Sequence, residues 1–444
     1  MPENSTASRL AAPLTERRYL LPFVLITSLF FVWAFGVSLN DILIPHLKRA
    51  FGLTDFQSSF IQVAFFGGYF IAALPAGWLM ERIGYKRGIL TGLVLCAAGA
   101  LLFLPASSIG VYQYFLVALF VMACGQSFLE VGANPYATVL GPPDSAERRL
   151  NFAQSFNAVG SVVAPLLGRA LILSNSEYTP AQIAAMSAAQ LGAYRQSAAS
   201  TVRGPYLIIA AVFLMIAAVL YFTHLPDVVE RPSSGDVAEA PGNLHGVFSH
   251  RHLVKGVIAQ FFYVGAQVGV ASFIIRFAQH VDPELTAKSA AKYLFLHQLG
   301  FMIGRFGGSA VMKRIAPPRL LALFAAASVV SAGIAVTASG FVPVVALVLI
   351  GFFHSIMYPT IFALSIKSLG AYTKRGSSFL VMAIIGGAVF PAIMGRISDA
   401  SSIQTAFIVP LLCYAYILYF ATSGYKPSSA ENAPPLEGLT MEAQ

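Results

Sequence analysis

The chain has 444 residues, of which 57% are hydrophobic and only 11% are charged. Soluble globular proteins carry about 25% charged residues, so this chain has too few charges to cover a water-facing surface. A soluble enzyme, a nucleic-acid-binding protein and a disordered scaffold are therefore disfavoured, and the net charge of +9 comes without a Lys/Arg-rich run. The three cysteines lie in apolar stretches without disulfide or metal-ligand spacing, so neither a metal nor a cofactor is expected.

Hydrophobic blocks long enough to cross a bilayer fill most of the sequence. A bilayer core about 30 Å thick takes roughly 20 apolar residues of helix. The predicted blocks are 20–46, 58–80, 87–106, 112–140, 149–173, 204–223, 252–279, 290–312, 319–339, 342–369, 376–398 and 403–423. They are continuous, unlike the alternating segments of a β-barrel. The first contains polar Asn40 and Asp41 and no small-residue cleavage site, so it is interpreted as a retained helix. We therefore expect an all-α membrane protein with twelve transmembrane helices.

The longest polar interruption divides these blocks into six and six. The predicted segments are a tail at 1–19, a six-helix half at 20–223, a linker at 224–251, a second half at 252–423 and a tail at 424–444. Tails and linker have a disorder-like composition. A second long loop, 174–203, is rich in alanine and predicts a short surface helix. If both termini are cytoplasmic, the inner loops carry roughly twice as many Lys and Arg residues as the outer loops, which favours that orientation.

The two halves repeat one another in sequence. Residues 80–83, Met-Glu-Arg-Ile, match residues 312–315, Met-Lys-Arg-Ile, and a constant offset pairs Arg148 with Arg375 further along. Matches in the same order indicate a duplicated six-helix unit, an architecture that holds its substrate between the halves near the membrane midplane.

A tight basic turn joins the second and third blocks. Its charges are expected to pair with neighbouring helix ends and to latch one conformation, through Gly77, Glu81, Arg82, Gly84 and Arg87.

Two acids lie where charge is costly. Of 19 acidic residues, only Asp41 and Glu130 lie well inside hydrophobic blocks. A charge at the bilayer centre costs about 2.5–3.5 kcal/mol on insertion scales, so such a residue is a functional candidate. A carboxyl group that is neutral or charged as water access changes suits proton coupling. The alternative is a structural acid with a basic or amide partner, and no Lys or Arg lies deep in the first six blocks. Both acids are predicted to couple protons.

Polar side chains surround these acids at helical spacing. Glu130 and Asn134 are four residues apart and share a helix face, as do Gln154 and Asn157. Amides and aromatic rings suit a sugar, whose hydroxyls need donors and acceptors and whose C–H face stacks on rings. The alternative is hydrogen bonding between helices. The predicted substrate-binding residues are Asn40, Asn134, Gln154, Asn157, Tyr263, Gln267, His354 and Tyr358. His297 and His354 lack metal-ligand spacing and are expected to pack or join a network instead.

Twelve spans, the repeat and the Gly77–Arg87 turn resemble the major facilitator superfamily. More narrowly, the chain resembles the fucose–galactose–glucose:proton symporter family at 39–45, 129–135, 153–157, 263–267, 303–306 and 358–362. This resemblance implies that Asp41 and Glu130 are the protonatable acids and that Gln154 and Asn157 line the sugar cavity. The chain departs from the family at Ala158-Val159, where a small polar residue is expected, and this leaves the identity of the sugar open.

The resemblance implies proton-coupled import of a neutral monosaccharide by alternating access, with L-fucose as first candidate and galactose or glucose as alternatives. Such a carrier is not an enzyme, and the proton is its coupling ion. We expect a monomer in a bacterial inner membrane, with the sugar, the proton and the lipid bilayer as partners and no nucleic acid. Uncoupled sugar facilitation stays open. A drug:proton antiporter would have a more apolar cavity, and a membrane sugar sensor would need a signalling domain that the sequence does not carry.

Overall fold

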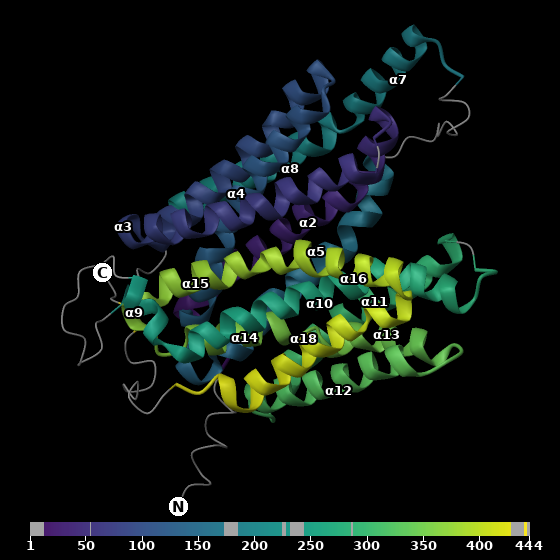
Figure 1. The fold of residues 1–444 in the computed structure, drawn as a ribbon. Helices are drawn as coiled ribbons and strands as arrows, with labels where there is room; N and C mark the ends of the chain where they lie inside the picture. The colour runs from purple at the N-terminus through teal and green to yellow at the C-terminus, as the bar shows by residue number, and fades with distance from the viewer. Residues whose placement is uncertain are drawn as a thin grey trace, which may run out of the picture.

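The computed structural model describes residues 13–53, 55–172, 185–223, 228–230, 244–285, 287–427 and 439–441. The first half is built from α2 (Leu20–Phe51), α3 (Asp55–Ile109), α4 (Tyr112–Val139), α5 (Ala146–Ile172), α7 (Ala188–Thr201) and α8 (Arg203–Phe222). The second half is built from α10 (Arg251–Val281), α11 (Ala287–Val311), α12 (Pro317–Thr337), α13 (Val342–Phe353), α14 (Met357–Ile366), α15 (Thr373–Met382), α16 (Gly386–Ala400), α17 (Ile403–Ala406) and α18 (Ile408–Tyr419). Figure 1 shows the halves as two layers, purple to teal above and green to yellow below.

Two of the predicted spans are broken or bent at positions marked by glycine or proline. The predicted second and third spans run together as α3, which is broken at Gly84. The φ of Gly84 is +80°, a conformation that glycine adopts readily because it has no side chain. In the tenth span α13 and α14 meet at a 40° bend. Pro359 lies just after this bend and has no N–H to donate to the Ser355 carbonyl four residues earlier. Arg305 donates from Nε to that carbonyl instead, at 3.0 Å.

Two long helices are less apolar than the rest. Eight of the described helices are long and apolar enough to cross a membrane, and the bent pair α13–α14 makes nine. Neither α5 nor α11 is among them, and these two pack on each other across the boundary between the halves. This pair of helices therefore brings polar side chains to the boundary between the halves.

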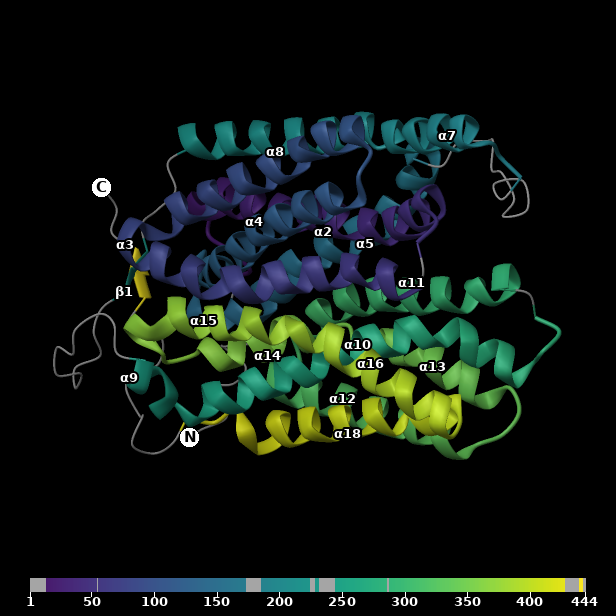
Figure 2. The same cartoon turned by 45° about the horizontal axis from the view of Figure 1, so that its top comes forward.

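The described parts of the linker and of the C-terminal tail lie at one end of the bundle, here called the tail end (Figures 1 and 2). There β1 (Val228–Glu230) pairs antiparallel with β2 (Leu439–Met441), which joins the linker to the C-terminal tail. The linker also contains α9 (Leu244–Ser249), and η1 (Arg17–Tyr19) precedes α2. At these described positions the tails and the linker are ordered, contrary to the disorder expected from their composition; the rest of that expectation falls on residues outside the described ranges. The short helix expected in the 174–203 loop is confirmed as α7, which begins at a capping box formed by Ser187 and Gln190.

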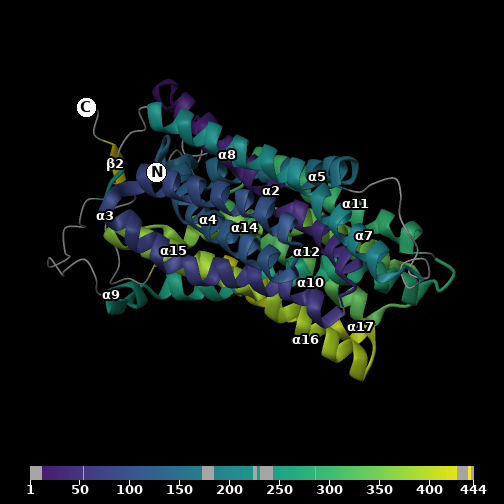
Figure 3. The same ribbon diagram turned by 90° about the horizontal axis from the view of Figure 1, so that it is seen from above.

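The halves meet closely at the tail end. Helix α15 runs beside α3 there, as Figure 3 shows from above. A Cβ at Gly77 of α3 would collide with the Ser378 hydroxyl of α15, so glycine permits this close approach. Asn151 of α5 donates to the Thr360 hydroxyl of α14 at 3.0 Å, another contact between the halves.

Candidate functional site

A cavity of about 740 Å³ lies between the two halves. Its volume falls in the range of ligand sites, about 300–1,000 Å³. Its wall includes Ser161 of α5, Ser272 of α10 and Ala291 of α11. Helix α10 ends at Val281 and α11 begins at Ala287, at the end opposite the tails. The cavity therefore extends away from the tail end, where the halves are closed.

Glu130 is an acid of this cavity wall. It lies in α4 and is 3% exposed. Tyr358 of α14 donates a hydrogen bond from its hydroxyl to Oε1 of this carboxylate, and so reaches it from the other half. The Arg305 guanidinium on α11 also interacts electrostatically with Glu130. A buried acid needs such partners because burial removes it from water.

Amides connect this acid to the boundary between the halves. Asn134 donates from Nδ2 to the Glu130 carbonyl at 3.0 Å, and Gln154 of α5 donates from Nε2 to Asn134 Oδ1 at 2.8 Å. Arg305 then donates from Nη1 to Gln154 Oε1 at 3.0 Å and to the Gln154 carbonyl at 2.6 Å. The predicted Glu130–Asn134 and Gln154–Asn157 faces thus meet in one network, which Arg305 extends into the second half.

Arg305 is the residue that the sequence reasoning missed. The first six blocks hold no deep Lys or Arg, whereas Arg305 comes from the eighth. It is 3% exposed, and its guanidinium carbon lies 4.5 Å from the centre of the Phe301 ring. Arg305 is a basic residue inside an apolar block, so it carries the same sequence signal as Asp41, a charge at a costly depth in the membrane.

The predicted substrate residues separate into three groups. Gln154, Asn157, Gln267 and Tyr358 line the cavity. Asn134, Tyr263 and His354 are buried just behind residues of the wall: Asn134 bonds Gln154, and the Tyr263 ring lies 6.0 Å from Tyr358 and 6.2 Å from His354. Asn40 and Asp41 belong to α2, but their side chains lie outside the described residues.

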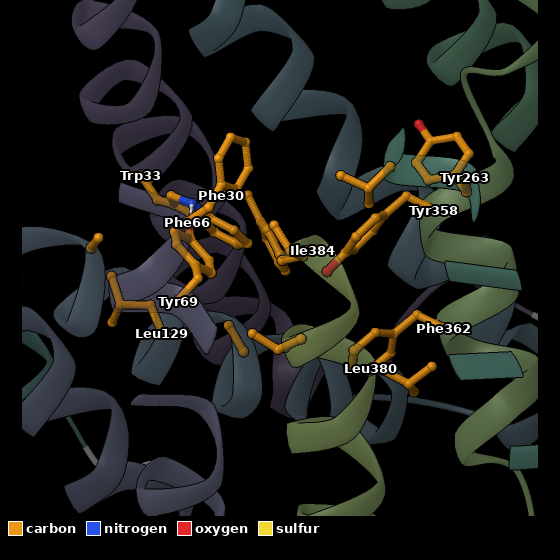
Figure 4. Close-up of a cluster of buried hydrophobic side chains, with 14 of the residues drawn as sticks. Phe30, Trp33, Phe66, Tyr69, Leu129, Tyr263, Tyr358, Phe362, Leu380 and Ile384 are labelled. Carbon is orange, nitrogen blue, oxygen red and sulfur yellow. Dashed lines mark hydrogen bonds between the residues drawn. The ribbon is translucent and has the colours of Figure 1, made fainter. Parts of the chain in front are cut away.

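An aromatic wall faces Tyr358 across the cavity. Trp33, Phe66 and Tyr69 of the first half lie on one side of Ile384, and Tyr358 lies on the other (Figure 4). Trp33 donates from Nε1 to the Tyr69 hydroxyl at 2.8 Å, which fixes the indole ring. Rings held in this way offer apolar faces next to polar groups, the combination that binds a sugar. Sequence reasoning missed this wall because aromatic residues in an apolar helix look like core.

The tail end carries ion pairs between the halves. Arg375 of α15 forms a bidentate ion pair with Glu81 of α3, with Nε 2.7 Å from Oε1 and Nη2 3.0 Å from Oε2. Lys367, the residue after the end of α14, pairs with Glu147 of α5 at 3.1 Å.

The other predicted latch residues play local parts. Exposed Arg82 stacks on the Trp78 ring at 3.8 Å, and Gly84 forms the break in α3. Arg87 is exposed on the α3 segment after that break. Among these five, Glu81 and Gly77 are the ones that touch described residues of the opposite half.

Fold and cavity together define a membrane carrier made of two six-helix halves. Residues 26–384 match the sequence profile of the Major Facilitator Superfamily. The chain is 46% identical over 409 residues to the L-fucose-proton symporter of Escherichia coli (strain K12), an alignment that covers 91% of this chain and 93% of that protein. It is 43% identical over 416 residues to a glucose/galactose transporter of Brucella abortus biovar 1 (strain 9-941), covering 93% and 96%.

Solved structures agree. A crystal structure of the transporter FucP in the outward conformation matches with a TM-score of 0.83 at 46% identity, covering 91% of this chain and 99% of that chain. The proton:xylose symporter XylE matches with a TM-score of 0.67 at 14% identity, covering 94% and 96%, which shows the shared fold alone. The chain belongs to the Major Facilitator Superfamily. The predicted fold class and the resemblance to the fucose–galactose–glucose:proton symporters are confirmed.

Proposed function

We propose that this protein imports a neutral monosaccharide together with protons, with L-fucose as first candidate and galactose or glucose as the alternative. The observation that carries the proposal is Glu130, a buried acid in the wall of a cavity between the halves, hydrogen-bonded by Tyr358 from the opposite half. The identity to an L-fucose-proton symporter supports both the sugar and the proton, and the identity to a glucose/galactose transporter supports the alternative.

The charges around the cavity favour an uncharged substrate. Arg305 is a cation in the wall, but it donates to Gln154 and Ser355 and has Glu130 as an opposite charge nearby. A carboxylate or phosphate substrate would have to compete with these partners. Sugar hydroxyls can instead bond to the amides of Asn157 and Gln267, which line the cavity, and the sugar can stack on the aromatic wall.

Protonation is the coupling step in this proposal. Glu130 of the first half lines the cavity and accepts a hydrogen bond from Tyr358 of the second half, so neutralising it weakens a charge-assisted hydrogen bond that links the halves. Asp41 is the second proton carrier, an assignment that rests on its place inside the first apolar block and on the family resemblance. Loaded and empty carriers then reorient, whereas a carrier holding only one of the two substrates does not.

Reorientation occurs by rocking of the two halves as units, 20–223 against 252–423, connected by the linker 224–251. With both termini in the cytoplasm of a bacterium, the closed tail end faces inward and the cavity faces outward, ready to take up sugar. The ion pairs of the tail end, above all Glu81–Arg375, hold this state. One chain suffices as the transport unit because the cavity lies between its own two halves.

Uptake into proteoliposomes tests the proposal. Purified full-length protein is given a panel of radiolabelled neutral sugars with and without an inward proton gradient. We expect L-fucose, galactose or glucose to accumulate above its outside concentration only with the gradient. Equilibration that the gradient does not raise would reveal an uncoupled facilitator. Uptake of no neutral sugar, with exchange of an organic acid or sugar phosphate instead, would overturn the substrate class.

A further inference from the structure

His297 of α11 is a buried histidine in the cavity wall, and one of its two ring nitrogens is hydrogen-bonded to the protein. The side chain has 0% exposure, and its residue lines the cavity. Nδ1 lies 2.8 Å from the carbonyl oxygen of Leu347 in α13. A carbonyl can only accept a hydrogen bond, so Nδ1 carries the proton. In the neutral ring, Nε2 therefore presents a lone pair and acts only as an acceptor.

That acceptor has no partner among the described residues. Nε2 of His297 is buried and unbonded, although buried polar atoms nearly always find one. The neighbouring His354 ring lies 4.9 Å away, but no hydrogen bond joins the two rings: its Nδ1 meets the Tyr414 hydroxyl at 3.2 Å, and its own Nε2 is unbonded among the described residues. His354 also lies behind the wall, whereas His297 lines it. An unpaired acceptor at the wall of a ligand cavity is explained if the ligand supplies the missing donor.

The place of His297 along α11 fits this reading. His297, Phe301 and Arg305 follow one another at intervals of four residues, so they form one stripe on the helix. The Phe301 ring lies 4.5 Å from the Arg305 guanidinium carbon and 5.3 Å from the His354 ring, which itself lies beside His297. His297 is thus about 12 Å nearer the open end of the cavity than Arg305. A sugar resting above the Gln154–Arg305 contact would meet it.

We propose that Nε2 of His297 accepts a hydrogen bond from one hydroxyl of the transported sugar and thereby selects sugars that carry this hydroxyl. The inference rests on the proposed function and adds a specificity residue to it. An amide such as Asn157 can turn either a donor or an acceptor to the ligand, so it tolerates different partners. A fixed acceptor discriminates against an analogue that lacks the matching hydroxyl. When that analogue binds, the acceptor is buried without a hydrogen bond, and the free energy of removing it from water is not recovered.

Two variants separate the acceptor from the packing of the ring. His297→Asn keeps an amide N–H near the position of Nδ1, where it can still donate to the Leu347 carbonyl, and removes Nε2. His297→Gln places a polar atom near the position of Nε2. The exposed His280 at the end of α10 provides the control His280→Gln, which removes an imidazole away from the cavity.

Calorimetry on purified full-length protein compares the sugar identified by uptake with its analogues, each lacking one ring hydroxyl. Wild type and His280→Gln should bind one analogue about 2- to 12-fold more weakly than the parent sugar through loss of this contact. His297→Asn should bind the parent more weakly by a similar factor and should no longer distinguish that analogue, while discrimination at the other hydroxyls stays. His297→Gln should recover part of the discrimination.

Two results would overturn the assignment. If His297→Asn discriminates among the analogues as wild type does, the ring has only a structural part. If His297→Asn binds the parent sugar and every analogue more weakly than wild type by the same factor, the substitution has only disturbed the packing. Both results leave the proposed function standing, whereas failure of wild type to bind any neutral sugar would reject the proposed function itself.

Discussion

The Glu81–Arg375 ion pair sets the strength of the closed tail end, and its removal is the sharpest test of how the halves are held. The pair is bidentate, and its side chains are 18% and 13% exposed. Breaking a fully buried pair costs about 3–5 kcal/mol, and breaking an exposed one costs about 0–1 kcal/mol. For this intermediate burial we expect about 1–3 kcal/mol, which shifts the balance between closed and open tail ends by about 5- to 150-fold.

Arg375→Gln should therefore populate a form with an open tail end. Spin labels on the exposed positions Asp144 and Lys313, one in each half near the tail end, would report this opening as a longer distance. The labels are placed in a background in which Cys96, Cys124 and Cys413 are replaced. Arg314→Gln, which removes an exposed charge at the same end, is the matched control and should leave the distances unchanged.

The exchanged pair, Glu81→Arg with Arg375→Glu, should recover much of the closed population because it restores opposite charges at the same place. If Arg375→Gln keeps the distance distribution of wild type while still binding sugar, the ion pair does not determine the conformational balance. The reasoning from its burial would then be refuted.

Three further predictions concern the cavity. Asp41→Asn and Asp41→Ala should abolish sugar accumulation driven by a pH gradient, since neither side chain can release a proton; full accumulation by either variant in proteoliposomes would remove Asp41 from the coupling mechanism. Glu130→Gln retains an oxygen that can accept from Tyr358 but cannot ionise, so it should keep sugar exchange across the membrane and lose net accumulation. Accumulation at the level of wild type would make this acid structural. Asn157→Ala should weaken sugar binding by about 1–3 kcal/mol in calorimetry, because a sugar hydroxyl is left without its partner in the cavity; an unchanged affinity would place the sugar elsewhere.

The sequence alone determined the helical architecture and the part of the site that comes from the first half of the chain. Apolar blocks near 20 residues have one stable form in a bilayer, the helix, because every backbone group must find a partner within its own segment. The cost of burying charge in those blocks then pointed to Glu130, and helical spacing placed Asn134, Gln154 and Asn157 on matching faces. These inferences hold because they depend on local chain geometry and on the membrane, both of which can be derived without knowing how the halves pack.

Only the tertiary structure decided which residues meet across the boundary between the halves. Tyr358 and Glu130 are far apart in sequence, as are Arg305 and Gln154, and no periodicity within one helix relates them. The aromatic wall at Trp33 and the free acceptor of His297 likewise depend on how neighbouring helices are rotated. The orientation of one packed helix against another follows from side-chain fit over its whole length, so it emerges from the assembled bundle rather than from any single segment.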